Sequence, residues 1–115
     1  MLLQQKSFTE AGRLLVHWMA QLQDHIEANT EQGEHAKAML EVITPVAKAF
    51  MTEQGFESCN LGMQIFGGHG YIREHGVEQQ VRDARIAMIY EGTTGIQALD
   101  LLGRKVMASQ GAARS

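Results

Sequence analysis

Hydrophobic residues recur at steps of three and four positions along most of the 115-residue chain, separated by short polar or glycine-rich stretches. This spacing is typical of helices with one apolar face, whereas a half-buried strand alternates at every second residue. The first stretch predicts a helix from Ser7 to about Ala28. Ser7 and Glu10 have the spacing of a capping box, and Thr9 is an alternative cap. The expected apolar stripe is Ala11, Leu14, Leu15, Trp18, Leu22 and Ile26.

The middle of the chain supports two interpretations. In the first, a short helix covers residues 34–43 and a longer one begins at Thr44-Pro45, because threonine caps well and proline lacks only an N–H that needs no partner there. In the second, one long helix covers residues 34–66 and bends at Pro45. The pattern of hydrophobic positions leaves both open.

Glycines mark two features of this middle region. Gly55 and Gly62 each cost about 1 kcal/mol relative to alanine inside a helix, so we expect another helix to approach them closely. Further on, three of the four residues in the segment 67–70 are glycine. Glycine adopts left-handed backbone conformations easily, so this segment is expected to end the helix.

The C-terminal part predicts a short helix over residues 77–84 and a last helix over 93–107, and residues 85–92 stay unassigned. Thr94 and Gln97 repeat the capping-box spacing. Residues 108–115 are small and polar and are expected to fray. The pattern therefore predicts a single all-α domain, an up-and-down helical bundle.

Composition excludes several classes of function. The net charge of −3 gives no basic surface for nucleic acid. Without a long apolar run, we expect no membrane span and a soluble, cytoplasmic protein. Cys59 is the only cysteine, so an internal disulfide is impossible and a reducing compartment is indicated. The five histidines have no i, i+3 or i, i+4 spacing, so no metal site is expected.

Two glycine-flanked segments are candidates for chemistry. Residues 64–71 bring a long amide side chain and open backbone to a helix end, which either turns a corner or binds a ligand. Arg73 stands where a dinucleotide-binding turn needs glycine or alanine, and no strand precedes the segment. Residues 89–95 place Glu91 just before a helix. Burial would raise the pKa of its carboxyl and the helix N-terminus would lower it, so it is either a solvated cap or a general base.

Together the two segments resemble the C-terminal helical domain of the flavin-dependent acyl-CoA dehydrogenases. The matching fragments, in register, are Gln64–Tyr71, Val77–Glu78, Arg82–Ala84, Ile89–Thr93 and Ile96–Gln97. Residues 45–50 are similar to the family's penultimate long helix. Residues 95–105 resemble the subgroup that includes 3-methylmercaptopropionyl-CoA dehydrogenase-like proteins.

The resemblance implies an enzyme that oxidises an acyl-CoA thioester to a trans-2-enoyl-CoA. In most branches of the family, the position of Glu91 carries the catalytic base, which takes the α proton while the β hydrogen leaves as hydride to flavin. A desolvated base suits the removal of so weak an acid. Tyr90 and Gly92 are the expected substrate-binding residues, because glycine lets the substrate lie close to the backbone.

The resemblance also implies FAD as the cofactor. The expected contacts to its ADP part, made across a subunit interface, are Gln64, Ile65, Phe66, Gly67 and Gly68. A second contacting stretch is Thr93, Thr94 and Gly95, where a helix N-terminus offers donors to phosphate. Many family members have glutamine or glutamate where this chain has Gly95, so a side-chain contact is lost there.

The family pattern further implies a homo-oligomer, dimer or tetramer, and an electron acceptor such as an electron-transfer flavoprotein. Its members carry an N-terminal helical domain and a middle β domain that this sequence lacks. We therefore interpret residues 1–115 as the single C-terminal domain of a longer parent, inactive alone. The alternatives are a non-catalytic helical assembly module and an acyl-CoA oxidase, which uses a similar glutamate.

Overall fold

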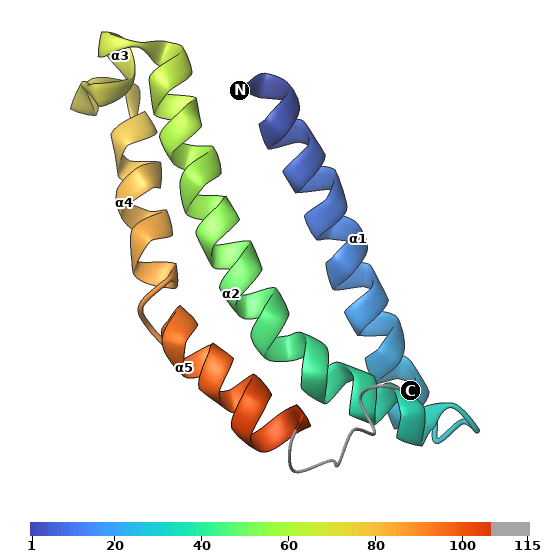
Figure 1. Ribbon diagram of the computed structural model, residues 1–115. Helices are drawn as coiled ribbons and strands as arrows, with labels where there is room; N and C mark the ends of the chain where they lie inside the picture. The colour runs from blue at the N-terminus through green and yellow to red at the C-terminus, as the bar shows by residue number, and fades with distance from the viewer. Residues whose placement is uncertain (107–115) are drawn as a thin grey trace.

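A computed structural model describes residues 1–106, and within them the regular structure is helical (Figure 1). The elements in chain order are α1 (Leu2–Glu27), α2 (Gly33–Phe66), α3 (Gly68–Tyr71), the 3₁₀ turn η1 (Arg73–His75), α4 (Val77–Ala87), α5 (Thr94–Leu99) and the π-helical segment η2 (Asp100–Val106). The long dimension of 53 Å is about the length of α2, at 1.5 Å per residue.

Helix α2 lies in the centre of the molecule. As Figure 1 shows, α1 runs antiparallel to it on one side, and α4 followed by α5 runs antiparallel to it on the other. Within residues 1–106, α1 has no close backbone contact with α4 or α5, so α2 joins the two sides. This arrangement confirms the predicted all-α, up-and-down fold.

The middle region is one helix, which confirms the second interpretation and makes the first one wrong. Pro45 lies buried inside α2, and the helix axis changes direction in the stretch that contains it (Figure 1). The Thr44 hydroxyl donates to the Leu40 carbonyl at 2.6 Å, so it bonds back into the preceding turn instead of capping a new helix. Proline here bends the helix without ending it.

Helix α1 begins at Leu2, so the predicted start at Ser7 is wrong. The Thr9 hydroxyl donates to the Gln5 carbonyl at 2.8 Å, again inside a helix. The predicted stripe is also partly wrong, because Ala11, Leu14 and Trp18 are exposed. The residues that face α2 are buried or half-buried at alternating steps of three and four: Phe8, Gly12, Leu15, Met19, Leu22 and Ile26.

Gly12 of α1 is buried against a side chain of α2. A Cβ at this position would lie 2.8 Å from Met51 Cε of α2. The prediction for Gly55 is wrong, because a Cβ there would meet nothing within 4 Å. At Gly62 it would meet only Gln5 Nε2, at an ordinary 3.8 Å. The predicted stripe was chosen from large residues, whereas the face that packs on α2 includes a glycine.

Gly67 ends α2, as predicted, with a φ of 62° and an N–H that donates to the Gln64 carbonyl at 3.0 Å. The chain then forms α3 and η1 where a loop was expected, and α4 continues to Ala87. Thr93, not Thr94, is the N-cap of α5, because its Oγ1 accepts the Ile96 N–H at 3.4 Å. Residues 107–115, with the predicted tail, lie outside the described residues.

The hydrophobic core of the described chain is small. Apart from Pro45 and two glycines, the buried residues in residues 1–103 are Leu22, Ala36 and Ala47, and many large apolar side chains are exposed. Leu14 and Leu99 are each 72% exposed, and Phe66 is 56% exposed. A protein of this length normally covers more of its apolar surface than this.

Candidate functional site

The turn between α4 and α5 carries Glu91. Two consecutive residues in this turn have positive φ, 55° at Glu91 and 101° at Gly92. Glycine adopts such angles easily, but a side-chain-bearing residue does so only when its surroundings enforce it. Glu91 and its neighbour Tyr90 are both exposed. The described residues therefore do not desolvate the Glu91 carboxylate, which the role of a buried base requires.

Lys48 of α2 binds the backbone carbonyls of this turn. Its Nζ donates to the Gly92 carbonyl at 2.6 Å and to the Ala87 carbonyl, at the end of α4, at 3.0 Å. The side chain is half-buried, and no carboxylate oxygen lies within 4.0 Å of its nitrogen among residues 1–103. Sequence reasoning missed Lys48, although it is the single charge in the apolar run of residues 45–50. A lone cation on an apolar helix face was the available signal.

Two further hydrogen bonds join α5 to its surroundings. Gln97 Nε2 donates to the Glu91 carbonyl at 3.3 Å, and a Cβ at Gly92 would lie 2.7 Å from the same nitrogen. The Thr94 hydroxyl donates to Glu53 Oε1 of α2 at 2.8 Å. The Thr94 side chain is therefore engaged within the chain.

The segment Gln64–Gly68 lies at the far end of α2 and is exposed throughout. A Cβ at Gly67 or at Gly68 would meet nothing within 4 Å, so the backbone of both residues is open to a ligand. The predicted open backbone at a helix end is therefore present. The ligand that these residues bind stays a prediction.

The two segments predicted to contact the cofactor, Gln64–Gly68 and Thr93–Gly95, lie apart in the structure. Thr94 contacts α2 at Glu53, and Gln64 lies further along the same helix by about 16 Å at 1.5 Å per residue. The structure groups Tyr90, Glu91 and Gly92 with residues 93–95, but it does not bring Gln64–Gly68 to them. The N-terminus of α5 is also partly occupied, because Thr93 accepts the N–H groups of Ile96 and Gln97.

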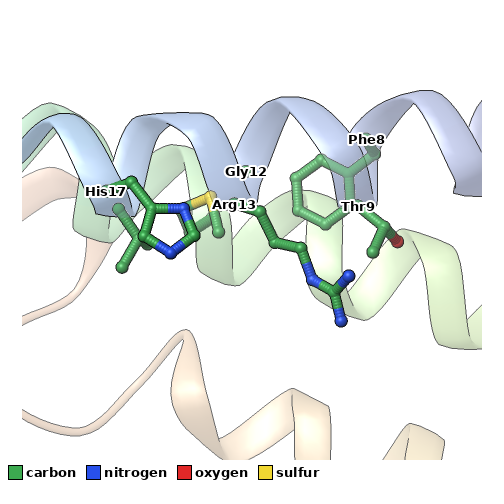
Figure 2. Close-up of a pocket in the computed structure, with 7 residues that line it drawn as sticks. Phe8, Thr9, Gly12, Arg13 and His17 are labelled. Atoms are coloured by element: carbon green, nitrogen blue, oxygen red, sulfur yellow. The ribbon is translucent and has the colours of Figure 1, made fainter.

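Two grooves have similar volumes. One, of about 530 Å³, is lined by Gln64 and Ile65 together with residues 1–3. The other lies over the contact of α1 with α2. It has a volume of about 520 Å³, and Figure 2 shows Arg13 and His17 extending from α1 beside it. The residues that line it are Phe8, Thr9, Gly12, Arg13, Val16, His17 and Met51. None of the predicted site residues is among them, so the groove is separate from the candidate site.

The remaining side chains that could react or bind a metal are the Cys59 thiol and the histidine rings. Burial raises the pKa of the half-buried Cys59 thiol above its ordinary value of 9.0, so the thiol stays protonated at neutral pH. The rings of His69 and His75 lie edge to face with centroids 5.5 Å apart, a proximity that sequence spacing did not predict. In the part of the chain that the structure describes, no three potential ligands group into a metal site. No helix there is long and apolar enough to cross a membrane.

The sequence matches a family model, the acyl-CoA dehydrogenase C-terminal domain, over residues 7–107. It is 48% identical to 3-methylmercaptopropionyl-CoA dehydrogenase of Ruegeria pomeroyi over 112 residues, 96% of this chain and 19% of that protein. A broad-specificity linear acyl-CoA dehydrogenase of Mycobacterium tuberculosis is 36% identical over 115 residues, 97% of this chain and 19% of that protein. A subunit of the caffeyl-CoA reductase-Etf complex of Acetobacterium woodii is 36% identical over 94 residues, 82% of this chain and 22% of that protein.

The chain belongs to the acyl-CoA dehydrogenase family, and the matching part is the C-terminal helical domain. Within the family it is similar to 3-methylmercaptopropionyl-CoA dehydrogenase, as the resemblance of residues 95–105 predicts. The relatives are named as oxidoreductases. The chain spans about a fifth of the length of the curated relatives it matches.

Proposed function

We propose that residues 1–115 are the C-terminal domain of a longer FAD-dependent acyl-CoA dehydrogenase, which oxidises an acyl-CoA thioester to a trans-2-enoyl-CoA. One observation carries the proposal. The family match runs through the turn of Glu91, and hydrogen bonds hold the backbone of this turn against α2 while the carboxylate stays exposed. Such a group is available to a substrate that covers it.

Glu91 is the proposed base. Its carboxylate takes the α proton of the thioester, and the electron pair of the broken C–H bond forms the double bond to the β carbon. FAD, when bound, accepts the hydrogen and electron pair that leave the β carbon. Because Glu91 is exposed in this chain, the bound acyl-CoA and the other domains must exclude water from it, which strengthens the base. Gly92 lets the thioester lie close to the backbone, and Tyr90 borders it.

The cofactor contacts fall on two surfaces. Gln64, Ile65, Phe66, Gly67 and Gly68 hold the ADP part of FAD, with their open backbone against it. Thr93, Thr94 and Gly95 form the second contact. The two surfaces are separated by about 16 Å along α2. We propose that residues 64–68 contact FAD across a subunit interface, as the family resemblance implies.

The exposed apolar side chains support assembly. Leu14, Leu99 and Phe66 are large and solvent-facing, as expected for a domain that other domains or a second subunit cover. We propose a cytoplasmic homo-oligomer, dimer or tetramer. An electron-transfer flavoprotein is the proposed electron acceptor, since the name of the Acetobacterium woodii relative places that protein in an Etf complex.

The test is Glu91→Gln in the full-length protein encoded by the reading frame that contains these residues. We expect flavin reduction by acyl-CoA to slow by about 10²–10⁴-fold, with FAD content and melting temperature unchanged. Glu31→Gln, on an exposed loop glutamate, is the matched control.

Near-normal reduction in Glu91→Gln would refute the role of the base. A full-length protein that binds no FAD would instead favour the non-catalytic assembly module. Rapid reoxidation of the reduced flavin by oxygen, without need of an electron-transfer protein, would favour the acyl-CoA oxidase.

A further inference from the structure

Side chains of α2 and α5 hold the backbone at Glu91 and Gly92, whereas no partner within residues 1–103 holds the Glu91 side chain. The Glu91 carbonyl accepts from Gln97 and the next carbonyl, of Gly92, accepts from Lys48. The Glu91 carboxylate makes no hydrogen bond or ion pair with residues 1–103. Within these residues, the position from which the side chain extends is therefore set by the backbone, at a φ of 55° that side-chain-bearing residues rarely adopt.

Of the two bonds, the one from Lys48 is the stronger. An ammonium donor forms shorter and stronger hydrogen bonds than an amide, and the 2.6 Å and 3.3 Å distances agree with this order. The second acceptor of Lys48, the Ala87 carbonyl, is at the C-terminal end of α4, where the helix dipole favours a cation. Lys48 thus binds the start and the end of the connection that contains Glu91.

We propose that Lys48 is a positioning residue for Glu91: by binding the Ala87 and Gly92 carbonyls, its ammonium group holds the turn in the conformation that aims the carboxylate at the substrate. This proposal rests on the proposed role of Glu91 as base. Lys48 does not touch the reacting atoms and takes no proton. It acts by keeping the residue at its strained φ, where a small displacement of the base slows proton abstraction strongly.

The experiment compares Lys48→Met, which keeps the length of the side chain without its charge, with Lys37→Met, on an exposed lysine of the same helix. Both are made in the full-length holoenzyme, with the rate of flavin reduction at saturating acyl-CoA expressed per bound FAD. We expect Lys48→Met to be about 10²-fold slower, with the dissociation constant of the acyl-CoA within two-fold of the control. Deuterium at the α carbon should slow Lys48→Met by a larger factor than Lys37→Met.

Two measurements separate positioning from a general structural role. Lys48→Arg, which can donate to both carbonyls, should recover most of the rate. Without FAD, amide hydrogen exchange in residues 88–97 should accelerate in Lys48→Met and stay unchanged in Lys37→Met. If Lys48→Met yields no holoenzyme, Lys48→Gln, which keeps one donor, replaces it with an expected loss of about ten-fold.

A per-flavin rate and isotope effect equal to the control in the folded variant would overturn the proposal. Glu91→Gln in the same protein distinguishes the two possible failures. If Glu91→Gln is inactive and Lys48→Met is normal, only the positioning role fails. If Glu91→Gln retains normal flavin reduction, the proposed function itself fails.

Discussion

The two sides of α2 are held by different balances of interaction. On one side, α1 packs mainly through an apolar stripe that includes Gly12 and the buried Leu22, with one hydrogen bond from Gln5 Nε2 to the Ser58 carbonyl at 3.0 Å. On the other side, polar side chains reach from α2 to α4 and α5, through Lys48 to two carbonyls and through Glu53 to a threonine hydroxyl. Apolar packing has no preferred direction, whereas a hydrogen bond requires particular atoms at particular distances.

This difference indicates which substitutions each side of α2 tolerates. The α1 side can lose or exchange methyl groups and stay folded at a cost in stability. The α4–α5 side determines the geometry of one turn, so a change there can leave stability almost intact and still alter Glu91. The following predictions test this contrast by urea unfolding of the 115-residue chain, in order of decreasing effect.

The largest expected effect is at Leu22. Leu22→Ala removes a buried side chain from the contact of α1 with α2 and should lower the free energy of unfolding by about 2–5 kcal/mol. Leu14→Ala, on the same helix but 72% exposed, is the control and should change it by less than about 0.5 kcal/mol. A larger loss in Leu14→Ala than in Leu22→Ala would show that the face of Leu14, and not that of Leu22, packs on α2.

A smaller loss is expected at Gly70, next to the end of α2. A Cβ there would lie 2.5 Å from the Met63 carbonyl oxygen, and backbone cannot move aside as a side chain can. Gly70→Ala should therefore destabilise by about 1–3 kcal/mol. Gly55→Ala, where a Cβ meets nothing within 4 Å, should stabilise by up to about 1 kcal/mol through helix propensity. Stabilisation by Gly70→Ala would contradict this close packing.

The smallest effect concerns the cap of α5. Thr93→Ala removes the hydroxyl that accepts the Ile96 N–H and should cost about 1 kcal/mol. Ser7→Ala is its counterpart, because Ser7 has capping-box spacing but lies inside α1. We expect that variant to be neutral or slightly stabilising. A larger loss at Ser7 than at Thr93 would restore the predicted start of the first helix.

Periodicity predicted that the chain is helical, but it did not predict the start of α1 or the face of α1 that packs on α2. The all-α fold and the end of α2 at Gly67 follow from residue type alone. The start of α1 was misplaced because Leu2 to Lys6 form a helix without a cap. The predicted stripe was partly wrong because the buried face of α1 includes Gly12, which a search for large residues ignores.

The candidate site divides in the same way. Glu91 and the residues of 64–68 are recognisable from the sequence because glycines flank them, whereas Lys48 is far from both along the chain. Its partners are backbone carbonyls, which leave no mark in the residue pattern. Only the three-dimensional fold shows which carbonyls meet a given lysine.

Because α2 is continuous, it fixes the distance and the rotation between two surfaces of the molecule. Glu53, which binds α5, and Gln64, which begins the proposed cofactor contact, are on the same uninterrupted helix. Inserting one residue between them would turn one surface relative to the other by about 100° and shift it by about 1.5 Å. Insertions and deletions compatible with both contacts are therefore expected outside this interval, in the connections at either end of the helix.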